Sequence, residues 1–149
     1  MKKLCVSILT TLFLASGTSL LSAQGDPAAG QAKSALCATC HGVDGNSDLS
    51  MNPKIAGQNY NYIVKQLQDY KSGARANATM SAMVAALSEQ DMMDIAAWFS
   101  SQEVVLLGAN VETLELGERI YRAGVKELSV AACSACHSPT GGGNGPAGF

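Results

Sequence analysis

Apolar side chains recur every three or four residues in two stretches of the chain, as they do on the buried face of an amphipathic α-helix. The first stretch runs from Tyr60 to Lys71, is followed by Gly73 as a stop signal, and repeats Ile63, Val64, Leu67 and Tyr70. The second begins after Ser88-Glu89-Gln90-Asp91, which has the form of a capping box, and repeats Met92, Ile95, Ala96 and Phe99. Both patterns predict helices with one buried face.

Two further helices are expected from other local signals. Asp26 suits an N-cap and Pro27 a first helical turn, and an alanine-rich run then leads to Cys37. Another helix is expected around Leu116–Ala123. The segment Gly42–Gln58 is rich in Gly, Asn, Asp, Ser and Pro and is predicted to be a loop. Because no stretch of any length alternates with the period of a strand, the predicted fold class is all-α.

The N-terminus has the pattern of a secretory signal peptide. Lys2 and Lys3 precede an uncharged stretch, Leu4–Leu21, and cleavage after Ala23 would follow a small residue. A retained membrane anchor is the alternative, but about 18 uncharged residues lie at the short end of a spanning length. Cleavage would remove Cys5 and leave eight basic against twelve acidic side chains, a formal net charge of −4. This charge argues against a nucleic-acid partner.

Both histidines and four of the five cysteines lie in two copies of one motif, "CATCH" at residues 37–41 and "CSACH" at residues 133–137. Two thiols on one helical turn can add to the two vinyl groups of a haem, and the adjacent imidazole can then ligate the iron. Two disulfides, a zinc site and a thioredoxin-like redox pair are the alternatives. One copy offers at most three zinc ligands, and no βαβ pattern accompanies either copy. The motif therefore favours c-type haem attachment through Cys37, Cys40, Cys133 and Cys136, with His41 and His137 as iron ligands.

A haem iron bound by His41 has a second axial position, and three methionines could fill it. Met80 follows a small, polar stretch that can fold back over the haem. Met51 is only ten residues from His41, and Met83 is expected to begin a helical turn that packs into the core. Methionine is more often a flexible core filler than a ligand. Spacing favours Met80, with Met83 as the alternative.

The chain resembles the cytochrome c4 family, two-haem periplasmic members of the class I c-type cytochromes. The resemblance is carried by "DPAAGQAKSALCATCHGVDGNS", "PKIAGQNYNYIVKQLQDYKSGAR" and "ALSEQDMMDIAAWFSSQ" for a first haem domain, and by "GERIYRAG" and "ACSACHSPTGGGNGPAGF" for the opening of a second. It implies a class I cytochrome c fold, covalently bound haem c, and Met80 as the sixth ligand. It also implies that the carbonyl of Pro53 accepts the free ring N–H of His41.

The repeated motif and the resemblance together suggest how the chain is divided. Residues 1–23 are the expected signal peptide, 24–102 a first cytochrome c haem domain, 103–113 a linker, and 114–149 an incomplete second haem domain. Pro53 follows His41 by twelve residues, and twelve residues follow His137, so no counterparts of Pro53 and Met80 are expected in the second unit. We interpret the chain as a truncated or partial sequence. A natural short form that uses the first domain alone is the alternative.

The resemblance implies a periplasmic carrier of single electrons, placed between a respiratory donor and a terminal oxidase. An iron with both His and Met ligands has no open position, and this ligation raises the reduction potential, so a carrier is expected and not an enzyme. Membrane association is not required for this role. Two rivals have other functions: a haem-bearing subunit of a flavin-dependent sulfide dehydrogenase, and a peroxidase whose second iron has His137 alone.

Overall fold

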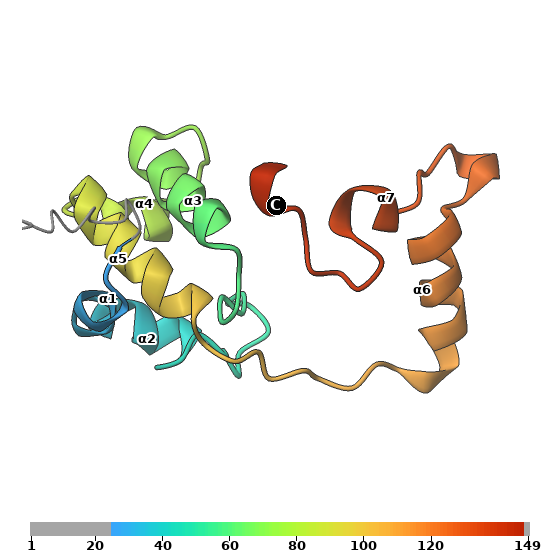
Figure 1. Ribbon diagram of the computed structural model, residues 1–149, viewed down its shortest axis with the longest axis horizontal. Helices are drawn as coiled ribbons and strands as arrows, with labels where there is room; N and C mark the ends of the chain where they lie inside the picture. The colour runs from blue at the N-terminus through green and yellow to red at the C-terminus, as the bar shows by residue number, and fades with distance from the viewer. Residues whose placement is uncertain (1–24, 148–149) are drawn as a thin grey trace, which may run out of the picture.

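The computed structural model describes residues 25–147. All the regular elements within that range are α-helices or 3-10 turns. An isolated antiparallel bridge between Val125 and Val130 is the one β contact among these residues. The helices form two groups that are separated by an extended segment (Figure 1). The first group is α1 (Pro27–Lys33), α2 (Ala35–His41), α3 (Tyr60–Ser72), α4 (Ala78–Val84) and α5 (Glu89–Ser100). The second is α6 (Val111–Ala123), α7 (Ser134–His137) and the short 3-10 turns η1 (Lys126–Leu128) and η2 (Gly145–Ala147). The all-α prediction is confirmed.

The periodic helices occur where the sequence predicts them. Helix α3 ends at Gly73, which adopts the left-handed conformation with φ +82°, where glycine lacks the steric penalty of a Cβ. Helix α5 begins with both bonds of the capping box, since the Ser88 side chain accepts the Asp91 N–H and the Asp91 side chain accepts the Ser88 N–H. The stripe predicted for this helix, Met92, Ile95, Ala96 and Phe99, is buried.

Three expectations differ from the structure. The helix expected to run from Pro27 into Cys37 is interrupted at Ser34, whose hydroxyl donates to the Gln31 carbonyl and ends α1. Helix α6 begins at Val111, inside the segment expected to be a linker, because the Asn110 side chain accepts the Glu112 N–H and caps it. Met83 lies near the end of α4 and is 48% exposed, so the prediction that it packs as core is wrong.

The first group is organised around the crossing of α1 and α5. A Cβ at Gly30 would lie 1.9 Å from the carbonyl oxygen of Asp94, so the two helices can approach this closely only at a glycine. The core lies between α3, the end of α4 and α5 and contains Ile63, Leu67, Val84, Met92, Ile95, Ala96 and Phe99. Helix α2, which carries the first cysteine motif, follows α1 along the chain, and its Cys37 packs against this core.

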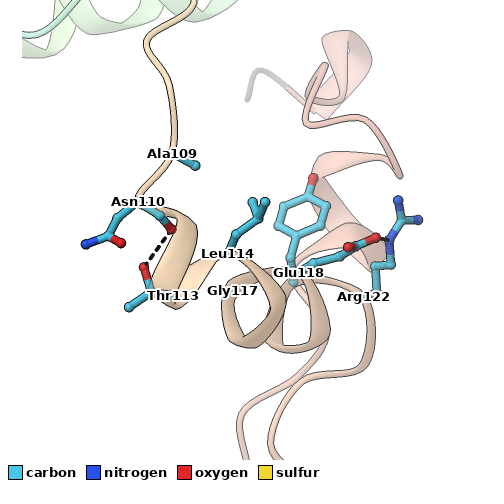
Figure 2. A pocket seen from close by; sticks show the side chains of 8 residues that line it. Ala109, Asn110, Thr113, Leu114, Gly117, Glu118 and Arg122 are labelled. Atoms are coloured by element: carbon cyan, nitrogen blue, oxygen red, sulfur yellow. Dashed lines mark hydrogen bonds and ion pairs between the residues drawn. The ribbon is translucent and has the colours of Figure 1, made fainter.

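The second group is far less buried than the first. Helix α6 has no buried residue, and a shallow groove runs along one face of it, lined among others by Leu114, Gly117 and Tyr121 (Figure 2). The Tyr121 hydroxyl donates to the Ser138 carbonyl at 2.6 Å, which holds the second motif against α6. Near the described end of the chain, η2 returns to the first group and contacts α3 (Figure 1).

Within the described residues, no helix is both long and apolar enough to cross a bilayer. The predicted signal peptide lies outside the described residues.

Candidate functional site

The first cysteine motif lies within the helix α2, where Cys37 is the third and Cys40 the sixth of seven residues, so the two thiols lie about one turn apart. Cys37 is half-buried against the core, Cys40 is exposed, and neither forms a disulfide. Burial raises the pKa of the Cys37 thiol. Since the thiolate is the form that oxidises and exchanges, the raised pKa favours the thiol form of Cys37. The arrangement suits two separate thioether bonds.

His41 ends α2 and points into the protein, where it is 8% exposed. Its Nδ1 lies 2.8 Å from the carbonyl oxygen of Pro53. A carbonyl can only accept, so Nδ1 carries the proton and Nε2 presents its lone pair. The structure therefore contains the hydrogen bond that the resemblance implied, and the bond leaves Nε2 as the atom that can ligate a metal.

The loop that carries Pro53 is held in place by backbone and side-chain contacts. The Gly45 carbonyl accepts the N–H groups of Ile55 at 2.8 Å and Ala56 at 3.1 Å. The buried hydroxyl of Ser47 donates to the Cys40 carbonyl at 3.1 Å, which joins the loop to the end of α2. These contacts fix the distance between His41 and Pro53. The orientation of the imidazole is thus set by a loop that is hydrogen-bonded within itself and to α2.

Met80 is the third residue of α4 and is half-buried against the core. The Asn77 side chain accepts the Met80 N–H at 2.9 Å, and the hydroxyl of Ser81 donates to the Tyr70 carbonyl at 3.0 Å. These bonds cap α4 and attach it to α3. By contrast, Met51 is 84% exposed on the loop and Met83 is half exposed. Of the three candidate methionines, Met80 alone packs against the core.

The second motif repeats the chemistry of the first in a more open setting. Cys133 precedes α7 and is half-buried, whereas Cys136 and His137 are exposed. Neither cysteine forms a disulfide. The shallow groove of Figure 2 lies along α6, and none of the residues that line it comes from either cysteine motif. The two motifs thus share residue types and spacing but differ in burial.

Two positioning residues were not expected from the sequence. Asn77 caps the short helix that carries Met80, although the preceding run of Gly, Ala and Asn suggests only a loop. Asn46, in the predicted loop, hydrogen-bonds to Asp44, Glu103 and Val105. Asparagine is a common N-cap residue, so Asn77 was an available signal for the start of α4. No sequence pattern identifies the partners of Asn46.

Comparison with known proteins places this arrangement in a family. The cytochrome c family profile matches residues 27–103. The chain is 46% identical to a cytochrome c4 from Pseudomonas aeruginosa, over the whole of this chain and 73% of the relative. The chain belongs to the cytochrome c4 family. The crystal structure of reduced recombinant cytochrome c4 from Pseudomonas stutzeri matches with a TM-score of 0.79 at 45% identity, covering 84% of this chain and 70% of that one.

A more distant relative differs in its described role. A thiosulfate dehydrogenase electron acceptor from Stutzerimonas stutzeri is 36% identical over 113 residues, which cover 73% of this chain and 52% of that protein. Membership of the cytochrome c4 family makes this cytochrome an electron carrier and not an enzyme, with covalently bound haem c as its cofactor. The residues present fit that cofactor, because paired thiols and an oriented imidazole lie on α2, and Cys37 and the Met80 thioether pack against the same core.

Proposed function

We propose that residues 24–102 form one haem-binding domain in which each axial position is supplied by a different helix. Cys37 and Cys40 would hold the haem through thioether bonds, His41 Nε2 would ligate the iron from α2, and the Met80 sulfur would ligate it from α4. The His41–Pro53 hydrogen bond carries this assignment, since it fixes both the tautomer and the ring orientation. Haem c supplies one-electron chemistry, and the chain supplies ligands and an apolar enclosure.

We further propose that Cys133, Cys136 and His137 form a second haem attachment site in the segment 114–149, joined to the first domain by a linker. The spacing of thiols and imidazole is the same in both motifs. The Tyr121 hydroxyl lies within hydrogen-bond distance of the carbonyls of His137 and Ser138, to which it can donate, and this contact holds the motif at the end of α6.

The proposed role is transfer of single electrons in the periplasm from a respiratory donor towards a terminal oxidase. The signal-like N-terminus supports export, and His/Met ligation suits a carrier of raised potential that does not bind oxygen. An alternative is electron transfer within a larger oxidoreductase, such as a flavin-dependent sulfide dehydrogenase. The relative that accepts electrons from thiosulfate dehydrogenase supports a dehydrogenase as a donor class.

The test is to measure oxidation of the reduced, purified protein by membranes that contain terminal oxidases. Cyanide-sensitive oxidation by the native chain is expected, with slower oxidation of a Met80→Ala variant. The matched control is Met83→Ala, which changes the same residue type one turn away on α4. Failure of the membranes to oxidise the native chain, together with its co-purification with a flavoprotein, would favour the subunit alternative.

A further inference from the structure

The first residues that follow α5 are held against the first group of helices by hydrogen bonds. The side-chain amide of Asn46 donates to the Glu103 carbonyl at 2.8 Å, and its oxygen accepts the Val105 N–H at 2.8 Å. One side chain therefore holds this segment at two points, as a neighbouring strand would. The next residues, Leu106–Ala109, make no hydrogen bond among the described residues.

Asn46 is itself fixed before it reaches the segment. Its backbone N–H donates to Asp44 Oδ1 and its side-chain amide donates to Asp44 Oδ2, both at 3.0 Å. The carboxylate of Asp44 thereby orients the amide, and these bonds lower the pKa of that carboxyl. A second contact supports the same segment: Val104 lies over Gly57, where a Cβ would come within 2.4 Å of Val104 Cγ2.

We propose that Asn46 is a positioning residue for electron exchange between the two haem sites, because it sets the point from which the second unit is tethered. With Val105 held, the free tether comprises the five residues 106–110 and spans at most about 17 Å. If Asn46 released the segment, Val104 would still contact Gly57, and the free residues 105–110 could span about 21 Å. Electron exchange between two haems falls steeply with the distance between them. The two hydrogen bonds from the Asn46 side chain, here called the Asn46 clamp, limit how far the second site can move away from the first.

The chemistry of the side chain explains why an amide serves at position 46. Asparagine can donate to one carbonyl and accept one N–H at the same time. Aspartate could accept the Val105 N–H, but it cannot donate to Glu103 and would place a second carboxylate beside Asp44. Both Asn46→Ala and Asn46→Asp should therefore release the segment, by different routes.

This proposal rests on the proposed second haem site, so its test separates the clamp from the haem. The holoprotein is compared with Asn46→Ala, Asn46→Asp and the control Asn61→Ala, an exposed asparagine on α3. Hydrogen exchange measures the exchange rate of the Val105 amide. Pulsed EPR measures the distance between spin labels at positions 68 and 115. The labels are attached to keto amino acids that replace Gln68 and Glu115, so that the cysteines stay free for haem. Visible spectra and the potential of the first haem report on the His41 site.

Both Asn46 variants should raise the exchange rate of Val105 by about tenfold, towards that of Leu106. Both should also broaden the label distances towards longer values, with an unchanged spectrum and first potential. Asn61→Ala should change none of these. An unchanged Val105 rate and distance distribution would overturn the proposal. Loss of the native spectrum along with the distance change would overturn it too, because that result indicates collapse of the loop. If mass spectrometry finds one haem while exchange and distances respond as expected, the clamp stands and the second haem site fails.

Discussion

Met80 and Met83 lie one turn apart on α4, yet their surroundings assign them different roles. Met80 packs against the core, whereas Met83 is 48% exposed. Met80→Ala should abolish the weak near-infrared sulfur-to-iron band, lower the potential and allow cyanide or imidazole to bind the iron. Met83→Ala should keep the band and change stability by at most about 0.5–1 kcal/mol, as expected for an exposed side chain. Loss of the band in Met83→Ala with retention in Met80→Ala would reverse the ligand assignment.

The two thiols of α2 are predicted to contribute one covalent bond each. Cys37→Ala or Cys40→Ala should leave haem attached through one thioether, and the double variant should have no covalent haem in the first domain. The core is built beside the motif, with Cys37 packed against it, so the double variant should also lose helix content by circular dichroism. The measurement is haem staining of a denaturing gel in a Cys133→Ala, Cys136→Ala background. A stained band from the fourfold variant would contradict the assignment.

The residues of the first site differ in how far the sequence reveals them. The cysteines and His41 follow from one local motif, and Pro53 from a family pattern around it. Met80 could be separated from Met83 only by spacing and resemblance, because burial depends on how α4 is capped by Asn77 and attached to Tyr70. The Met83 prediction failed for the same reason: helical period alone does not say which turn of a short helix faces the core.

Two glycines, one in a helix of each group, allow the effect of helix packing to be tested. A Cβ at Gly30 would lie 1.9 Å from the Asp94 carbonyl, whereas a Cβ at Gly117 would meet no described atom within 4 Å. Gly30→Ala should therefore force α1 and α5 apart and destabilise the first domain by about 1–3 kcal/mol or more. Gly117→Ala should instead be neutral or stabilise α6 by up to about 1 kcal/mol through helix propensity. Thermal unfolding of the two variants, followed at 222 nm, checks both signs; equal effects would contradict the difference in packing.

Helices α1 and α5 are also joined by an ionic cluster. Lys33 Nζ lies 2.6 Å from Asp91 and 2.7 Å from Asp94, and the nearly buried Asp94 also accepts from the Asp26 N–H and Gln90. The Lys33 ammonium is the main reason that the pKa values of both carboxyls are lowered. A lowered folded-state pKa stabilises the fold above the ordinary carboxyl pKa near 4, and this stability is lost as pH falls further.

The midpoint of thermal unfolding should consequently drop below about pH 4 as these carboxylates take up protons. Asp94→Asn should lower the midpoint at pH 7, because it removes the charge that pairs with Lys33. It should also flatten the decline below pH 4. Asp48→Asn, which changes an exposed loop carboxylate, is the control and should leave the pH profile unchanged. A profile for Asp94→Asn that stays parallel to that of the native chain would argue against this coupling.

The elements were predictable where the period and the caps agree, as in α3 and α5. The elements were less predictable where a single polar contact determines the residue at which a helix begins or ends. The Ser34 hydroxyl interrupts an alanine-rich run that otherwise favours a continuous helix, and Asn110 starts α6 five residues before the expected Leu116. The Asn46 clamp has no sequence signal, because the two groups that it holds are backbone groups more than fifty residues away.

At the scale of the molecule, one motif is enclosed and the other is open. His41 is 8% exposed inside a packed group of five helices, whereas His137 is exposed and α6 has no buried residue. A haem bound at the first motif would lie against the core on which Cys37 and Met80 pack. A haem bound at the second, in the 149-residue chain, would keep a large apolar surface in water, which costs about 25 cal/mol for each Å² exposed.

This contrast predicts two different haems in the 149-residue chain. The first should be low-spin and resist added imidazole, since the proposed ligands His41 and Met80 would fill both axial positions. The second should be sub-stoichiometric or high-spin, and it should bind imidazole readily because solvent reaches it. Mass spectrometry counts the haems, and an imidazole titration followed by visible spectra measures their accessibility.

The double variant Cys133→Ala, Cys136→Ala is the control, and it should lose the imidazole-binding component while the low-spin spectrum remains. Two low-spin haems that both resist imidazole in a monomer of the 149-residue chain would contradict the difference in enclosure.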